Sequence, residues 1–134
     1  MMKSALIILI FLTNNLATKT TLFRANDLID NIANSFRNGD SKEIGVHFST
    51  SVSLSILDDN NTYSKNQAEI LLHNFFEKYN FRSVKILHRM ETNATNRYAV
   101  LELNTSDRQF RVSLSLKNFN AKFLITDIKI DLLK

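Results

Sequence analysis

Residues 26–76 read NDLIDNIANSFRNGDSKEIGVHFSTSVSLSILDDNNTYSKNQAEILLHNFF, and the succession of patterns in them narrows the fold more than any other part of the chain. The apolar residues recur first every three or four positions, then every second position, and then every three or four again. This predicts a helix, a short helix, a strand and a longer helix. The remainder of the chain alternates in the manner of strands, so the sequence indicates an α+β domain.

The first helix is predicted over residues 27–38, with Asn26 as its cap and Gly39 as the left-handed residue that ends it. The second helix is short and is predicted over residues 41–48, where Asp40 and Glu43 resemble a capping box. Both helices place their apolar residues on one face.

The strand that follows is predicted from the alternation of Val52, Leu54 and Ile56 with serines, and residues 58–61 are predicted to form a turn. Ser64 and Gln67 then form a capping box that starts the third helix. Its apolar stripe consists of Ala68, Leu71, Leu72, Phe75, Phe76 and Tyr79. The phenylalanines Phe36, Phe48, Phe75, Phe76 and Phe110 are expected in the core, because aromatic side chains dominate ordinary cores.

Four further strands are predicted over residues 84–92, 97–104, 110–117 and 122–133, and the short turns between them indicate an antiparallel meander. The expected fold is therefore α+β, with three N-terminal helices packed on one curved, mainly antiparallel sheet. The helices must cover the apolar face of that sheet. The other face is expected to meet solvent or a partner, and it carries Lys85, Arg89, Arg111 and Lys117.

The order helix-helix-strand-helix and then four strands resembles the nuclear transport factor 2-like superfamily, also called cystatin-like α+β cones. Residues 36–40 (FRNGD), followed by Ile44 and Phe48, resemble the exit of that superfamily's first helix. Residues 63–65 (YSK) and the stripe after them resemble its third helix. More narrowly, the chain resembles an exported bacterial family, the domain of unknown function 4783. The resemblance implies a cone whose mouth often holds a small ligand, and it implies no particular activity.

The first twenty residues have the layout of a secretory signal: Lys3, an apolar block over residues 5–12, and a small, polar stretch over residues 13–21. We expect residues 1–20 to be this signal and residues 24–134 to be one domain. The protein is then exported, periplasmic or secreted. A buried N-terminal helix and an uncleaved anchor are the alternatives, and the anchor is the one expected route to a membrane, because the block is too short to span it unaided.

Composition excludes several kinds of site. The chain has no cysteine, so it has no disulfide, thiol catalysis or cysteine-zinc site. Its three histidines lack metal-ligand spacing, and its two glycines form no phosphate loop, so no cofactor or metal is expected. Residues 81–134 contain ten Lys and Arg against five Asp and Glu. These basic residues are spread over several strands without clustered exposed aromatics, so no nucleic acid is expected either.

The expected function is that of an exported, non-catalytic domain that binds a small apolar ligand or a protein partner through the cone mouth or the sheet face. The candidate ligand-binding residues are Tyr63, Phe76, His88, Met90, Tyr98 and Glu102. The alternative is a lyase or isomerase of the ketosteroid isomerase type that uses Glu102 or His88. His88 is expected on the inner face, between Ile86 and Met90, whereas the direction of Glu102 stays open.

A homodimer through the sheet is a third hypothesis. It predicts an apolar stretch on the outer face that contains Leu87, Leu101 and Leu103.

Overall fold

The computed structural model describes residues 27–91 and 93–133, and the predicted signal lies outside these ranges. None of the described helices is long and apolar enough to cross a membrane. The elements, in chain order, are α1 (Leu28–Asn38), α2 (Ser41–Val46), β1 (Phe48–Ile56), β2 (Asp59–Ser64), α3 (Lys65–Lys78), β3 (Ser83–Met90), β4 (Asn96–Asn104), β5 (Gln109–Phe119) and β6 (Lys122–Leu132).

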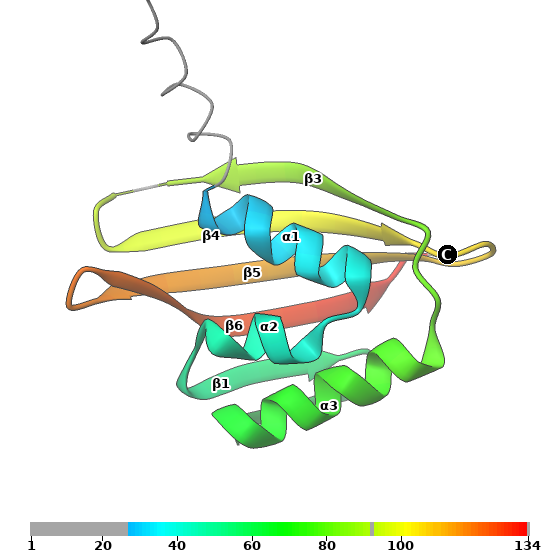
Figure 1. Ribbon diagram of the computed structural model, residues 1–134, viewed down its shortest axis with the longest axis horizontal. Helices are drawn as coiled ribbons and strands as arrows, with labels where there is room; N and C mark the ends of the chain where they lie inside the picture. The colour runs from blue at the N-terminus through cyan, green and yellow to red at the C-terminus, as the bar shows by residue number, and fades with distance from the viewer. Residues whose placement is uncertain (1–26, 92, 134) are drawn as a thin grey trace, which may run out of the picture.

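The strands form one sheet in the order β2-β1-β6-β5-β4-β3. All neighbours pair antiparallel except β1 and β6, which are parallel. The three helices lie across one face of the curved sheet (Figure 1). The predicted fold class and the meander β3-β4-β5-β6 are therefore confirmed.

The core lies between the helices and this inner face of the sheet. The five predicted core phenylalanines are confirmed there, with Phe36, Phe48, Phe75 and Phe110 buried and Phe76 packed against them. Phe75 is the centre of an aromatic cluster, since its ring centroid lies 5.2 to 6.0 Å from those of Phe76, Tyr79, Phe81 and Phe110. Such contacts add to the burial of the rings, and they fill the space beneath the helices with side chains.

The helix ends follow local hydrogen bonding. Asp27 caps α1, because its Oδ1 accepts from the backbone N–H groups of Ile29 at 2.7 Å and Asp30 at 3.2 Å. Gly39 ends α1 with a φ of 64°, as predicted. The Oγ of Ser64 accepts from the backbone N–H of Gln67 at 3.2 Å, which confirms the start of α3. The second helix is shorter than predicted, because Phe48 already belongs to β1.

The strand β2 is an element that the sequence patterns did not predict. Residues 58–61 were expected to be only a turn, yet Asp59 to Ser64 pair with β1 along one edge of the sheet. Every residue of β2 except Tyr63 is exposed, so the strand shows no apolar alternation. An edge strand of this kind is blunted by polar side chains.

A β-bulge in β3 decides which side chains face the helices. Ile86 lies opposite Leu101 and His88 opposite Val100, so Leu87 has no partner on β4. Because paired residues share a face, Ile86 faces the helices while His88 and Met90 face the outer side. Three expectations are thereby corrected: neither His88 nor Met90 is on the inner face, and Arg89, opposite the buried Ala99, is not on the outer one. Leu101 and Leu103, which the dimer hypothesis places on the outer face, are buried on the inner one.

Candidate functional site

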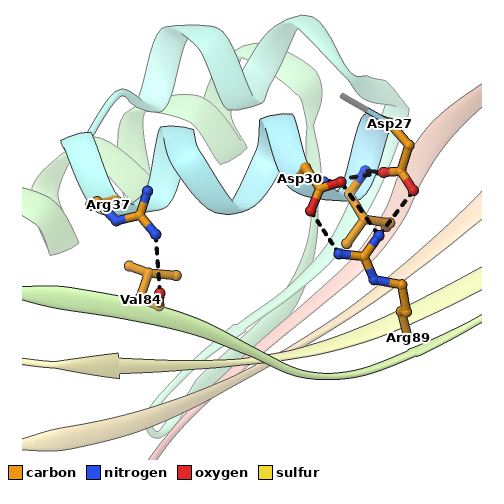
Figure 2. A network of polar contacts seen from close by, with 6 residues as sticks. Asp27, Asp30, Arg37, Val84 and Arg89 are labelled. Atoms are coloured by element: carbon orange, nitrogen blue, oxygen red, sulfur yellow. Dashed lines mark hydrogen bonds and ion pairs between the residues drawn. The ribbon is translucent and has the colours of Figure 1, made fainter. Parts of the chain in front are cut away.

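The bulge turns Arg89 toward the first turn of α1 (Figure 2). Its Nη1 donates to the Oδ2 of Asp27 at 3.0 Å, and its Nη2 donates to the Oδ1 of Asp30 at 2.7 Å. The hydrogen bond to Asp30 raises the pKa of the Arg89 guanidinium above its ordinary value. At the other end of the helix, the Nη2 of Arg37 donates to the carbonyl of Val84 at 3.2 Å. These contacts fasten both ends of α1 to β3, and we read them as structural.

A hollow with apolar walls lies elsewhere, between the C-terminal half of α3 and the turn from β1 to β2. We call it the α3 pocket. Its volume is about 450 Å³, and its lining combines apolar walls with a polar rim. Binding sites for small ligands are typically concave, mostly apolar and of this size. The lining residues are Ile56, Leu57, Leu71, Phe75 and Tyr79 on the walls and Asp59, Asn74, Glu77 and Lys78 around them.

The local structure explains why these walls meet. Leu71, Phe75 and Tyr79 are spaced four residues apart, so they follow one side of α3 and its C-terminal cap. Leu57 has a left-handed backbone with a φ of 56°, and its N–H donates to the carbonyl of Ile130 at 2.9 Å. That conformation is unfavourable for a leucine. The left-handed conformation occurs where the chain leaves β1, and Leu57 lines the pocket at this point.

The polar rim offers a few hydrogen-bonding groups. The hydroxyl of Tyr63 donates to the Oδ2 of Asp59 at 2.9 Å, and this bond raises the pKa of the Tyr63 phenol. Tyr79 is half-buried. No hydrogen bond of its hydroxyl occurs among the described residues, and Tyr79 lines the pocket. A pocket with apolar walls and polar groups at its rim favours a ligand that is apolar over most of its surface and carries a polar end.

The described residues do not assemble an acid–base pair in a dry environment. Their buried polar side chains are Ser35, Ser41 and Ser49. Asp59 and Tyr63 are within hydrogen-bonding distance, but Asp59 is exposed. In an enzyme of the ketosteroid isomerase type, a carboxylate that acts as a base or as a neutral acid needs a pocket that excludes water. Nor do three or more of the described His, Asp and Glu residues gather into a candidate metal site.

The six residues predicted from the sequence do not converge on one pocket. His88, Met90, Tyr98 and Glu102 lie on the outer face, because they share it with Val100 across β3 and β4. The open direction of Glu102 is thus resolved, and its Oε2 accepts from the side-chain amide of Asn104 at 3.0 Å.

The other two predicted residues lie on the helix side of the sheet. Tyr63 reaches the rim of the α3 pocket through Asp59. Phe76 packs edge-on against Phe36, with ring centroids 5.6 Å apart, beside Gly39. Whether any of the six contacts a ligand stays a prediction.

The residues that line the α3 pocket come from two separate elements, α3 and the end of β1. Leu71, Phe75 and Tyr79 belong to the predicted stripe of the third helix. Their partners Ile56 and Leu57 stand at a strand end, where the left-handed turn is not visible in the residue types. The pocket therefore could not be assembled from periodicity alone.

A second, more polar hollow opens on the outer face, with a volume of about 630 Å³. It lies where the pairing of β1 with β6 jumps from Phe48 to Ser53, and serine and threonine side chains form much of its lining. It is larger than the α3 pocket, but most of its lining residues are serine or threonine, so we favour the α3 pocket as the candidate site for an apolar ligand.

Comparison with known families gives one match, to the family described as Domain of unknown function (DUF4783), over residues 29–131. A search of curated proteins gives no match.

Solved structures show where this fold occurs. A DUF4783 protein from Bacteroides uniformis superposes with a TM-score of 0.76 at 22% identity, covering 81% of this chain and 99% of that one. A DUF4783 protein from Bacteroides fragilis gives 0.73 at 23% identity, with 79% and 99% covered. A nuclear transport factor 2-like protein of unknown function from Shewanella baltica gives 0.62 at 12% identity, with 90% and 99% covered. At these identities the likeness shows the fold alone.

Proposed function

We propose a non-catalytic binding role for this chain, which belongs to the DUF4783 family. In this proposal the α3 pocket binds a small apolar ligand. The ligand enters with its apolar part against Leu57, Leu71 and Phe75. A single polar group then meets the hydroxyl of Tyr79 or the charged rim. The observation that carries the proposal is the shape and lining of this pocket of about 450 Å³.

The size of the pocket limits the ligand. Drug-sized ligands occupy pockets of roughly 300 to 1,000 Å³, so this pocket suits one small molecule and not a folded partner. The surrounding core supports a preformed site, since Phe75 is buried and contacts four other aromatic rings. A rigid wall costs little conformational entropy when a ligand binds.

The alternative, a lyase or isomerase of the ketosteroid isomerase type, has less support. Its two proposed groups, Glu102 and His88, lie on the outer face and not in the α3 pocket. The Asp59–Tyr63 pair beside the pocket is the specific observation in its favour. Because Asp59 is exposed, a proton taken up there would be shared with solvent, so the pair suits hydrogen bonding to a ligand better than catalysis.

Export is part of the proposal and rests on residues 1–20 alone, whose basic start, apolar block and small polar stretch match a secretory signal. In an exported protein, the pocket would meet ligands outside the cytoplasm.

The proposal is tested with the apolar fluorescent probe N-phenyl-1-naphthylamine, whose emission rises when it leaves water. We expect saturable binding to the wild-type chain and at least about a tenfold weaker affinity for Leu71→Trp, because the larger side chain fills the pocket. The matched control is Val46→Trp, an equally large residue at an exposed position of α2 outside the pocket.

Circular dichroism of both variants checks that the fold is kept. Equal probe binding by the two tryptophan variants, or no saturable binding by the wild type, would exclude the α3 pocket as the site.

A further inference from the structure

The polar hollow of about 630 Å³ on the outer face lies where two register shifts of the sheet coincide. In β6, Thr126 has no partner on β5, because the register shifts between Ser115 and Leu116. On the other side of β6, residues 49–52 of β1 stand against Thr126 alone. Irregularities of this kind bend the strands and are frequent next to binding sites. We call this site the bulge hollow.

Hydroxyl side chains make up most of its lining. The hydroxyl of Ser49 is buried and donates to the backbone carbonyl of Ser51, and that of Thr126 lies 3.0 Å from the Oδ2 of Asp127. The remaining hydroxyls form no hydrogen bond among the described residues, and each can both donate and accept. They belong to Thr50, Ser51, Ser53 and Thr62.

Two opposite charges line the same hollow. Asp127 lies opposite Ser115, and Lys117 follows two residues later on β5, so both side chains project from the outer face. Diagonal neighbours of this kind are about 7 to 8 Å apart. The ion pairs among the described residues do not include either of them. A ligand group placed between them can therefore accept from the ammonium and donate to the carboxylate.

The hollow also has an apolar wall. Phe119 is 46% exposed and Leu124 is half-buried, and both belong to the lining. The face of an aromatic ring carries partial negative charge, so it attracts C–H groups that carry partial positive charge. The bulge hollow thus combines one exposed aromatic face with hydroxyl, ammonium and carboxylate groups.

We propose that the bulge hollow binds a saccharide of one or two rings. A pyranose ring has an apolar C–H face, which packs on Phe119, and a rim of hydroxyls, which reaches Asp127 and Lys117. Neighbouring hydroxyls of a sugar both donate and accept, so they satisfy the two charges and the serine and threonine hydroxyls together. The volume lies in the range of small-ligand sites.

Other ligand classes fit the lining less well. A wholly apolar ligand would leave the hydroxyls and both charges without partners, which costs binding free energy. An amino acid can meet Lys117 and Asp127 with its carboxylate and ammonium groups, but it leaves most of the hydroxyls unused. The saccharide site is also independent of the α3 pocket, since the two hollows share no lining residue and lie on opposite faces of the sheet.

The test is a titration of the ¹⁵N-labelled full chain, followed by amide chemical shifts. The probes are maltose, cellobiose, lactose and diacetylchitobiose, each raised to about 20 mM so that millimolar affinities are detected. We expect at least one of them to give saturable shifts centred on Ser51, Phe119 and Asp127. Sorbitol, which has hydroxyls but no ring face, and glycine, which has both charges but no hydroxyl, should leave these amides unmoved.

Two variants assign the contacts. Phe119→Ala removes the ring, and Asp127→Asn removes the charged acceptor, so each should bind the selected sugar at least about tenfold more weakly. Leu87→Ala is the matched control, because Leu87 is also 46% exposed but lies outside the hollow, and it should bind like the wild type.

The proposal is overturned if none of the four disaccharides gives saturable shifts at these amides, if sorbitol or glycine binds there as tightly, or if Phe119→Ala binds normally. The apolar probe of the α3 pocket is expected to move other amides, those of Leu57, Leu71 and Tyr79. Failure at one site is therefore distinguished from failure at the other.

Discussion

Replacing Arg89 by methionine should loosen α1 from the sheet by a measurable but modest amount. The change removes the ion pairs with two carboxylates, whose shortest contacts are 3.0 Å to Asp27 and 2.7 Å to Asp30. It keeps an apolar stem of similar length. The three side chains are 38%, 29% and 32% exposed, so solvent screens the pairs, and each is worth about 0.5 kcal/mol. The expected loss in the free energy of unfolding is therefore about 1 kcal/mol.

The loss has an upper limit because both carboxylates keep favourable surroundings without Arg89. Asp27 still caps α1 through Oδ1, and both carboxylates stay near the positive end of the helix dipole. They are also solvated, so removing the guanidinium does not strand a buried charge.

Urea unfolding followed by circular dichroism measures this loss. With a slope of about 2 kcal/mol per molar urea, 1 kcal/mol moves the midpoint down by about 0.5 M. The shift should shrink in about 1 M salt, where the screening length falls to about 3 Å. Arg82→Met is the control, because Arg82 is exposed and its side chain forms no hydrogen bond or ion pair among the described residues. Equal midpoints for the two variants would refute the role assigned to the bulge, namely to turn Arg89 onto α1.

Three further outcomes are expected. Ala121→Gly should raise the free energy of unfolding by about 0.5 to 1 kcal/mol in a urea titration, because Asn120 and Ala121 both have positive φ (52° and 69°) in the β5–β6 turn; an unchanged or lower value would contradict it. Burial lowers the pKa of His47, so stability should fall as pH drops from about 6.5 toward the lowered folded-state pKa. His47→Gln should flatten that slope, and an identical slope would contradict the assignment. Deleting residues 1–20 should leave the protein in the cytoplasmic fraction while the full chain is exported; export of the shortened chain would remove the signal from the account.

The sequence predicted those parts of the fold that depend on local chemistry. A few neighbouring residues are enough to determine each of three features: the cap at Ser64, the left-handed Gly39 and the apolar stripe of α3. The antiparallel meander followed from alternation and short turns.

The predictions that were wrong concern features that depend on how a strand pairs with its neighbour in the sheet. The segment from Val84 to Met90 does not alternate cleanly, because Ile86 and Leu87 are both apolar, and the bulge lies at this break in the pattern. That one extra residue reversed the faces of His88 and Arg89. The strand β2 was missed because a polar edge strand and a polar turn have the same composition.

The candidate site was less predictable than the fold for the same reason. Of the six predicted residues, Tyr63 alone reaches the rim of the α3 pocket, through Asp59. The walls of this pocket come from a helix and a strand end that are brought together by the backbone of Leu57. Periodicity locates a buried face, but it does not say where that face is left uncovered.

The most direct measurement of the central claim is a titration of the ¹⁵N-labelled chain with N-phenyl-1-naphthylamine, followed by amide chemical shifts. The α3 pocket as binding site predicts saturable shifts centred on Leu57, Leu71 and Tyr79, with the amides of His88 and Tyr98 unmoved. Shifts that gather on the outer face around His88 and Tyr98, or that leave the amides of the pocket in place, would contradict it.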